Sequence, residues 1–325
     1  MKHILSLSFL LLILSCKTST KSESITITNT EVKETVSYLA SDGLQGRHAG
    51  SEGVEKAASY IESKFKAYGI KPYYDTYRDT FKIDSLDAFN VIGFIEGTDE
   101  NLKNEIIVLG AHYDHIGSGG DAKRKSRKGN ITETDSIANG ANDNASGTSA
   151  VIAMARYFAA KKTNKRSIMF ALFSAEELGL LGSKHLAKRL KSENINLYTM
   201  VNFEMIGVPF KDRNYQAFIT GYDLSNMANK INEYVGSNFI GLSEVAKQYN
   251  LFKQSDNFAF YKAFNLPSQT ISSCDLSNYD YYHHAEDETH ELNYDFMATL
   301  INNSILAIEK MSNTPTKEIV MYESE

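Results

Sequence analysis

Cysteine is scarce in this sequence, with only Cys16 and Cys274 among 325 residues. A fold held together by several disulfides is therefore excluded, and clustered thiolates are not available for a structural zinc site. Nothing around Cys274 resembles a cysteine–histidine arrangement, so we expect this cysteine to be a small buried residue rather than a nucleophile. Stability must then come from an apolar core, which a chain of this length is able to bury.

The sequence also lacks an excess of positive charge. Its formal net charge is −6 at pH 7, and no extended face of a single sign is evident. This balance argues against a nucleic-acid-binding protein, which needs a basic surface. Internal repeats and an obvious interdomain linker are absent as well, so we expect one catalytic domain.

The apolar run near the N-terminus, Ile4 to Leu14, is too short to span a bilayer stably. It follows Lys2 and His3, an arrangement typical of a secretory signal. The next residues complete the segment Ile13-Leu14-Ser15-Cys16, which resembles the lipobox of bacterial lipoproteins, in which the cysteine is acylated. We expect a signal peptide over residues 1–15, and a lipidated Cys16 with its linker over residues 16–29. The protein would then be exported and anchored on a bacterial envelope membrane; a plain cleaved signal with a chance cysteine is the simpler interpretation.

Strand and helix patterns alternate along the rest of the chain. Residues 105–110 and 167–173 are continuous apolar runs, typical of strands that are covered on both faces. Amphipathic spacing predicts several helices, among them 30–40, 54–68, 146–160, 178–190 and 294–310. We therefore expect an α/β fold of three layers, with a mixed, mostly parallel central sheet between helices, over residues 30–311.

Two segments look peripheral to that domain. Residues 117–139 form a glycine-, serine- and charge-rich insert that includes five cations in the six residues from Lys123 to Lys128. We interpret it first as a solvated loop and second as a patch for substrate or lipid headgroups. Because it lies between two candidate ligands, it could also border the site as a lid. Residues 312–325 are expected to be a frayed tail.

One short segment organises the candidate chemistry. Residues Gly140 to Gly147 read G-A-N-D-N-A-S-G and place a carboxylate, Asp143, in a glycine-flanked turn before a helix. Other metal-ligand types follow predicted strands or occur late in the chain: His112, Asp114, Glu176, Glu177, Glu204, His283 and His284. Since sites in open α/β sheets gather at the carboxyl ends of strands, we expect these side chains to meet. Nitrogen and oxygen donors without thiolates favour zinc in a hydrolytic site.

Adjacent carboxylates, Glu176 and Glu177, follow the strand predicted at 167–173. Neighbouring side chains at a strand end point in different directions, so one can bind metal while the other acts as a general base. An acidic helix start is the simpler interpretation of this pair alone. In His112-Tyr113-Asp114 the spacing allows Asp114 to orient the imidazole.

Taken in order, six segments resemble the co-catalytic di-zinc aminopeptidases of metallopeptidase clan MH. They are G-A-H-Y-D-H, G-A-N-D-N-A-S-G, F-S-A-E-E-L-G-L-L-G-S, V-N-F-E-M-I-G, S-D-N-F-A-F and Y-Y-H-H-A-E-D. The resemblance covers about residues 39 to 287 and begins with a G-R-x-x-G-S loop. Relatives include secreted bacterial leucyl aminopeptidases, glutamate carboxypeptidase and glutaminyl cyclase. It implies a zinc exopeptidase-like fold, peptide substrates and release of N-terminal residues.

The resemblance also implies a set of metal ligands. Asp143 would bridge two zinc ions. His112 and Glu204 would complete the protein ligands of one ion, while Glu177 and His283 would complete those of the other.

Roles in the reaction follow from the same resemblance. Glu176 would be the general base, Asp114 would be the partner of His112, and Tyr282 would help to bind the tetrahedral intermediate. His284 stands where relatives usually have threonine, so His283 is the expected ligand of the pair.

Three features depart from the family pattern. Glu204 stands where many relatives carry aspartate, and Asn257 replaces the histidine usual in S-D-H. The insert lengthens the gap between His112 and Asp143. A weak second metal at Glu204 would favour a glutaminyl cyclase-like acyltransferase with one zinc. The sequence is also compatible with carboxypeptidase or dipeptidase action and with a non-catalytic binding ectodomain.

Overall fold

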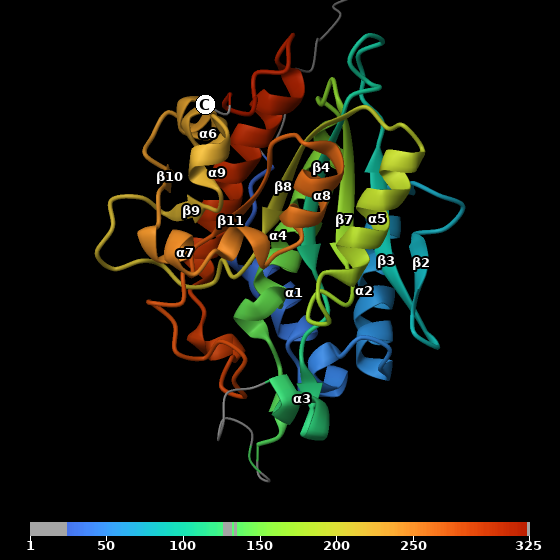
Figure 1. The fold of residues 1–325 in the computed structure, drawn as a ribbon, viewed down its shortest axis with the longest axis vertical. Helices are drawn as coiled ribbons and strands as arrows, with labels where there is room; N and C mark the ends of the chain where they lie inside the picture. Colours follow the sequence, from blue (N-terminus) through green and yellow to red (C-terminus); the bar gives the residue numbers. More distant parts are fainter. Residues whose placement is uncertain (1–24, 126–131, 133–134, 324–325) are drawn as a thin grey trace, which may run out of the picture.

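The computed structural model describes residues 25–125, 132 and 135–323, and the elements below belong to these residues. The strands of one sheet follow the order β1-β3-β7-β4-β8-β11-β9-β10 (Figure 1). The remaining strand, β2, pairs antiparallel with β3 outside this order. These strands are β1 (Lys71–Pro72), β2 (Arg78–Ile83), β3 (Leu86–Ile95), β4 (Ile106–His112), β7 (Ser167–Phe173), β8 (Leu197–Phe203), β9 (Ala217–Ile219), β10 (Ile240–Gly241) and β11 (Ser268–Ser272).

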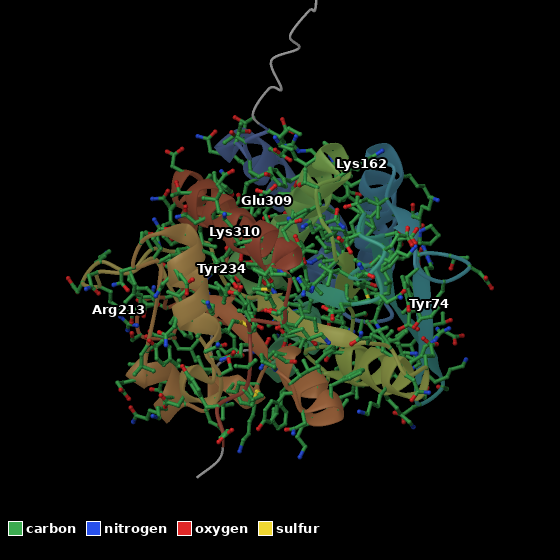
Figure 2. All side chains as sticks on the ribbon, turned by 90° about the horizontal axis from the view of Figure 1, so that it is seen from above. Tyr74, Lys162, Arg213, Tyr234, Glu309 and Lys310 are labelled. Atoms are coloured by element: carbon green, nitrogen blue, oxygen red, sulfur yellow. The ribbon has the colours of Figure 1, made fainter. Side chains whose placement is uncertain are left out.

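Four adjacent strands of this sheet run in one direction. β4 pairs in parallel with β7 and β8, and β8 pairs in parallel with β11. The outer strands reverse, since β3 is antiparallel to β7 and β9 is antiparallel to β11. The carboxyl ends of β7, β4, β8 and β11 therefore meet at one edge. From above, the labelled Tyr74 and Arg213 mark opposite sides of the molecule (Figure 2).

Helices cover both faces of the sheet, as the sequence predicts (Figure 1). Along β4, Ile107, Leu109 and Ala111 pack into one apolar core, whereas Ile106 and Val108 pack into the other. The first core also takes residues from α1 (Asn29–Leu39), α2 (Glu52–Tyr68), α4 (Gly147–Lys161), α6 (Met227–Val235) and α9 (Tyr294–Asn313). The second takes residues from α5 (Leu181–Ser192) and α8 (Asn257–Phe264). The three-layer α/β expectation is confirmed.

Local signals in the sequence set the helix ends. Ser51 caps α2 by accepting a hydrogen bond from the N–H of Val54, and Gly69 ends it with a left-handed φ of 72°. The helix expected to begin at residue 178 begins at Leu181 instead, because Leu180 adopts a left-handed φ of 61° and breaks the helical path.

The insert is partly ordered, in contrast to a wholly solvated loop. Within it, β5 (Gly117–Ser118) pairs antiparallel with β6 (Ile137–Ala138), and α3 (Gly119–Lys125) follows β5. Ala122 and Ala138 are buried in a small cluster that anchors this end. Half of the basic run, residues 126–128, lies outside the described residues.

The expectation of a frayed tail is wrong for residues 312–323. Ser312 and Asn313 continue α9, and Met321 forms an antiparallel bridge with Ser225. Ile319 is only 2% exposed, and its N–H donates to the hydroxyl of Tyr198. The tail is ordered because the Ile319 side chain is buried and backbone N–H groups of the tail form hydrogen bonds. The composition of the tail does not predict either contact.

The expected signal segment, the lipobox with Cys16 and the linker as far as residue 24 lie outside the described residues. Among the helices of the described part of the chain, none combines the length and apolar character needed to cross a membrane.

Candidate metal centre

The Asp143 turn lies at the carboxyl edge of the sheet and is shaped by its glycines. Residues 141–146 form an irregular turn of helix, and the Asp143–Asn144 peptide bond is cis. Gly140 adopts a left-handed φ of 59°, which glycine tolerates without strain. A Cβ on Gly147 would lie 2.2 Å from the carbonyl oxygen of Phe203, so only glycine permits this close approach. Asp143 itself is 2% exposed.

A first group of donors gathers on one oxygen of Asp143. His112 ends β4, and its Nε2 lies 3.3 Å from Oδ1 of Asp143. The same nitrogen lies 3.8 Å from Oε1 of Glu204, which follows β8. These three atoms come from separate segments, and the parallel strand ends bring them together. The structure thus places the first expected ligand set in one cluster.

A second group gathers on the other oxygen of Asp143. His283 Nε2 lies 3.4 Å from Oδ2 of Asp143 and 3.1 Å from Oε2 of Glu177. An unexpected residue joins them: Nδ1 of His115 lies 3.0 Å from Oε1 of Glu177 and 3.8 Å from Oδ2 of Asp143. His115 closes the G-A-H-Y-D-H segment, but it lies beyond the end of β4, where strand alternation no longer predicts the direction of a side chain.

Asp114 contacts His112 differently from the expectation. The hydrogen bond of His112 Nδ1 goes to the main-chain oxygen of Asp114 at 3.2 Å, and the carboxylate oxygen Oδ1 lies further away at 3.7 Å. That oxygen accepts a hydrogen bond from the N–H of Glu176 at 3.2 Å. Asp114 therefore orients the imidazole through its backbone and positions Glu176 through its side chain.

The two adjacent glutamates have opposite electrostatic character. Burial raises the pKa of Glu176 well above its ordinary value, and Glu204 and Glu177 add to this effect. Burial also raises the pKa of Glu177, but His283 and His115 outweigh it and lower that pKa to about 2. The carboxyl of Glu177 therefore stays ionised, while that of Glu176 can hold a proton.

Backbone conformation is constrained beside several donors. Ala175 precedes Glu176 with a left-handed φ of 58°, and Met205 follows Glu204 with a φ of 49°. His283 itself has a φ of 54°. Non-glycine residues in this region are uncommon and gather at functional sites, where the surroundings hold them.

The late segment brings His283 rather than His284 to the centre. Tyr282 stacks on the His283 ring with centroids 4.0 Å apart, and it lines a cavity together with Glu204. The ring of His284 instead packs against Tyr281, and its Nδ1 accepts a hydrogen bond from the N–H of Glu286. His284 thus closes its own turn.

Glu204 and Asn257, the two residues that depart from the family pattern, both form hydrogen bonds within the fold. The hydroxyl of Ser255 donates a hydrogen bond to Oε2 of Glu204, and Oε1 of Glu204 lies toward His112. Asn257 donates to the carbonyl oxygens of Phe252 and Ser268. Asn257 is therefore a structural link at the start of α8.

Arg47, from the G-R-x-x-G-S loop, is a fully buried cation behind the centre. It donates to main-chain oxygens only: Tyr113 at 2.9 Å, Asn139 at 2.6 Å, Gly140 at 3.0 Å and Leu39. The pKa of Arg47 is lowered to about 10, because the effect of burial exceeds the opposing effect of nearby carboxylates. The guanidinium thus ties the segment after β4 to the Asp143 turn and stays charged at neutral pH.

The donors fit a zinc centre. Carboxylates and imidazoles converge without thiolates, which is the chemistry of hydrolytic zinc sites. Within the described residues, His112 Nε2 is buried without a hydrogen-bond partner. Burial lowers the pKa of His112, but Glu176, Asp114, Asp143 and Glu204 raise it well above its ordinary value. The buried negative charge requires a compensating cation.

Sequence comparisons point to the same chemistry. The chain is 28% identical over 230 residues to leucine aminopeptidase 2 of the fungus Arthroderma otae, covering 70% of this chain and 41% of the relative. It is 29% identical over 201 residues to a probable zinc metalloprotease of Pyrenophora teres, covering 56% of this chain and 39% of the relative. The chain thus spans about two fifths of the length of these curated relatives.

Solved structures share the fold at low identity. An aminopeptidase from Aneurinibacillus superposes with a TM-score of 0.65 at 16% identity, covering 92% of this chain and 97% of that one. The glutaminyl cyclase of Fimbriiglobus ruber superposes with a TM-score of 0.67 at 17% identity, covering 88% and 96%.

A family profile spans the segment that supplies the sheet edge and all the donors above. The profile described as Peptidase family M28 matches residues 90–308, from β3 to within α9. The chain belongs to peptidase family M28, a family of zinc metallopeptidases.

Proposed function

We propose that this chain is a zinc-dependent exopeptidase that removes N-terminal residues from peptides. The observation that carries the proposal is the pair of donor groups that share Asp143, with Glu176 beside them. The aminopeptidase names of a sequence relative and a structural neighbour agree with this assignment.

Five expected ligands would hold two zinc ions. Asp143 would contribute one oxygen to each ion, His112 and Glu204 would serve one, and Glu177 and His283 the other. When bound, zinc supplies Lewis acidity that polarises a carbonyl group and lowers the pKa of water.

Proton transfer falls to Glu176. Its raised pKa makes it a stronger base than an ordinary carboxylate, and the Asp114 side chain fixes its backbone. In the proposed reaction Glu176 takes a proton from the attacking water, whose oxygen adds to the scissile carbonyl carbon. Glu176 then returns the proton to the amine as the carbon–nitrogen bond breaks. The Tyr282 hydroxyl is the candidate donor to the developing oxyanion.

A cavity beside Glu204 is the candidate pocket for the substrate side chain. It measures about 50 Å³, and its apolar wall includes Met205, Phe218, Leu251 and Leu276. This is much smaller than the roughly 150 Å³ of a cavity that binds benzene. We therefore propose a preference for small apolar N-terminal residues.

A substrate panel tests the proposal. Aminoacyl chromogenic amides carrying alanine, valine, phenylalanine or lysine are compared with dipeptides varied at the C-terminus, with and without added zinc. We expect the alanine and valine amides to be cleaved fastest. A chelator should abolish cleavage, and Glu176→Gln should lower kcat by about 10²–10⁴-fold with the zinc content unchanged. The exposed Glu286→Gln is the matched control, and full activity in Glu176→Gln would overturn the mechanism.

Glutaminyl cyclase activity is the second candidate, because a glutaminyl cyclase shares this fold closely. Glu204, where many relatives carry the shorter aspartate, is the position at which one zinc ion would be held less tightly. Zinc analysis of the purified protein and an assay with an N-terminal glutaminyl peptide separate the two activities. About one zinc ion per chain with cyclisation would replace the peptidase proposal, whereas about two with amide cleavage would support it.

We also propose that Cys16 carries a lipid that anchors the protein to a bacterial envelope membrane. The lipobox-like Leu14-Ser15-Cys16 after a short apolar run supports this proposal. Metabolic labelling with radioactive palmitate should mark the full-length protein and should fail in Cys16→Ala. Labelling that persists in this variant would overturn the proposal.

A further inference from the structure

His115 occupies a position that the expected ligand set leaves unexplained. Its side chain is fully buried at the centre, and its ring lies 5.7 Å from that of His283, centroid to centroid. The two oxygens of Glu177 each face one imidazole: Oε1 lies 3.0 Å from Nδ1 of His115, and Oε2 lies 3.1 Å from Nε2 of His283. Glu177 is thus placed between two histidines.

Both ring nitrogens of the buried His115 side chain, Nδ1 and Nε2, are without a hydrogen bond of good geometry among the described residues. Native proteins rarely leave buried polar atoms in this state, and a bound ion can satisfy them. The nearby oxygens of Asp143 and Glu177 are themselves expected zinc ligands.

The surrounding backbone is built to admit this ring. A Cβ on Gly140 would lie 2.6 Å from Cγ and Cδ2 of His115, so any larger residue would displace the imidazole. The N–H of His115 donates to the carbonyl oxygen of Arg47 at 3.3 Å, which fixes the chain just after β4. The same glycine that shapes the Asp143 turn therefore makes room for His115.

We infer that His115 is a further protein ligand of the zinc ion held by Asp143, Glu177 and His283. This inference rests on the proposed zinc site. Ligands at about 2.0–2.1 Å around a tetrahedral ion lie roughly 3.3 Å apart, and each of the two histidine nitrogens lies near that distance from the carboxylates of Asp143 and Glu177. His115 Nδ1 lies 3.0 and 3.8 Å from the two carboxylates, and His283 Nε2 lies 3.1 and 3.4 Å from them.

With His115 as a ligand, the two proposed zinc positions differ in the number of their protein ligands. The position of Asp143, Glu177, His283 and His115 has four protein donors, which is the number typical of closed structural zinc sites. The position of His112, Asp143 and Glu204 keeps three and leaves room for substrate, as catalytic sites do. Glu176 is tied to the open position through Asp114, which accepts a hydrogen bond from the N–H of Glu176 and contacts His112 through its main-chain oxygen.

X-ray absorption at the zinc edge tests the inference on the wild-type protein without any activity measurement. Imidazole rings give a characteristic outer-shell signal, and we expect about three imidazoles for two zinc ions. Two imidazoles for two ions would overturn the inference and leave the proposed function intact. A protein that binds no zinc would instead contradict the proposed function.

A variant gives the second readout. His115→Phe keeps an aromatic ring beside Gly140 but supplies no donor, and His284→Phe is the matched control in a turn outside the centre. Dialysis against a graded chelator should remove one zinc ion from the wild-type protein before the other. In His115→Phe the second ion should dissociate at about 100-fold lower chelator concentration, with one fewer imidazole in the absorption spectrum. If the second zinc ion dissociates from folded His115→Phe at the same chelator concentration as from the wild-type protein, His115 lies beside Glu177 without binding zinc.

Discussion

The carboxylate of Asp287 holds the backbone of Asp143. Its Oδ2 accepts a hydrogen bond from the N–H of Asp143 at 3.0 Å, and its Oδ1 accepts one from the N–H of Asn142 at 2.7 Å. The hydroxyl of Tyr279 donates to the same Oδ1 at 2.6 Å. Asp287 is fully buried and lies four residues after His283. The segment that supplies His283 thus also fixes the turn that holds Asp143.

Asp287→Asn should damage the centre without touching a donor. The asparagine amide can accept from only one of the two N–H groups and turns its own N–H₂ toward the other. Hydrogen bonds to charged groups contribute about 1.5–3 kcal/mol each, so the free energy of unfolding should fall by about 2–4 kcal/mol. Thermal unfolding and zinc content check this, with the exposed Asp280→Asn as the control. Equal zinc affinity and stability in Asp287→Asn would contradict the role given to this clamp.

The shared position of Asp143 predicts unequal losses of metal. Asp143 has one oxygen in each donor group, whereas Glu204 contributes to one group only. Asp143→Ala should therefore lose both zinc ions, and Glu204→Ala should lose mainly one. Elemental analysis after dialysis measures the zinc per chain, and the exposed Glu286→Ala is the control. Loss of a single ion from both variants would show that Asp143 does not bridge.

Arg47 should matter for folding rather than for the reaction itself. Arg47→Met leaves four buried main-chain oxygens without their donor, at a cost of about 1–3 kcal/mol for each unsatisfied group. We expect little folded protein from Arg47→Met and partial recovery in Arg47→Lys, whose ammonium reaches fewer of these oxygens. Solubility and urea unfolding are compared with the exposed Lys188→Met. Wild-type stability of Arg47→Met would refute this account.

The buried carboxylate of Asp79 gives a prediction about pH. Asp79 on β2 accepts hydrogen bonds from Asn90 at 3.0 Å and Arg189 at 2.8 Å, and His185 lies 3.3 Å away. Burial by itself raises the pKa of Asp79, but these partners outweigh it and lower the pKa below its ordinary value of 3.8. A lowered folded-state pKa means that ionised Asp79 stabilises the fold above its ordinary pKa and that the benefit disappears as the pH falls through the folded pKa.

Asp79→Asn removes this dependence. The variant should be less stable than the wild-type protein at pH 6, and the difference should shrink as the pH falls below about 4. Urea unfolding at a series of pH values measures it, beside the exposed Asp87→Asn. A difference that stays constant or grows on acidification would show that Asp79 is not stabilised in its ionised form.

The order of residues is enough to predict the layers of this fold and most of the donors. Apolar runs such as 167–173 predict central strands because both of their faces are covered, and the glycines around Asp143 predict the tight turn that the structure contains. Ligand types placed after predicted strands could be found for the same reason, since parallel strands end at one edge. These features are local, so they are visible in the linear sequence.

The meeting of particular side chains depends on packing in three dimensions. His115 lies past its strand, so the path of the chain around Gly140 sets its direction, and no periodicity reports that path. The hydrogen bonds of Asp287 to the Asp143 turn and those of the buried Arg47 join segments that are distant in sequence. The ordered tail depends on Ile319 finding space against the core. Local sequence does not encode such contacts, because each of them requires the rest of the fold to be in place.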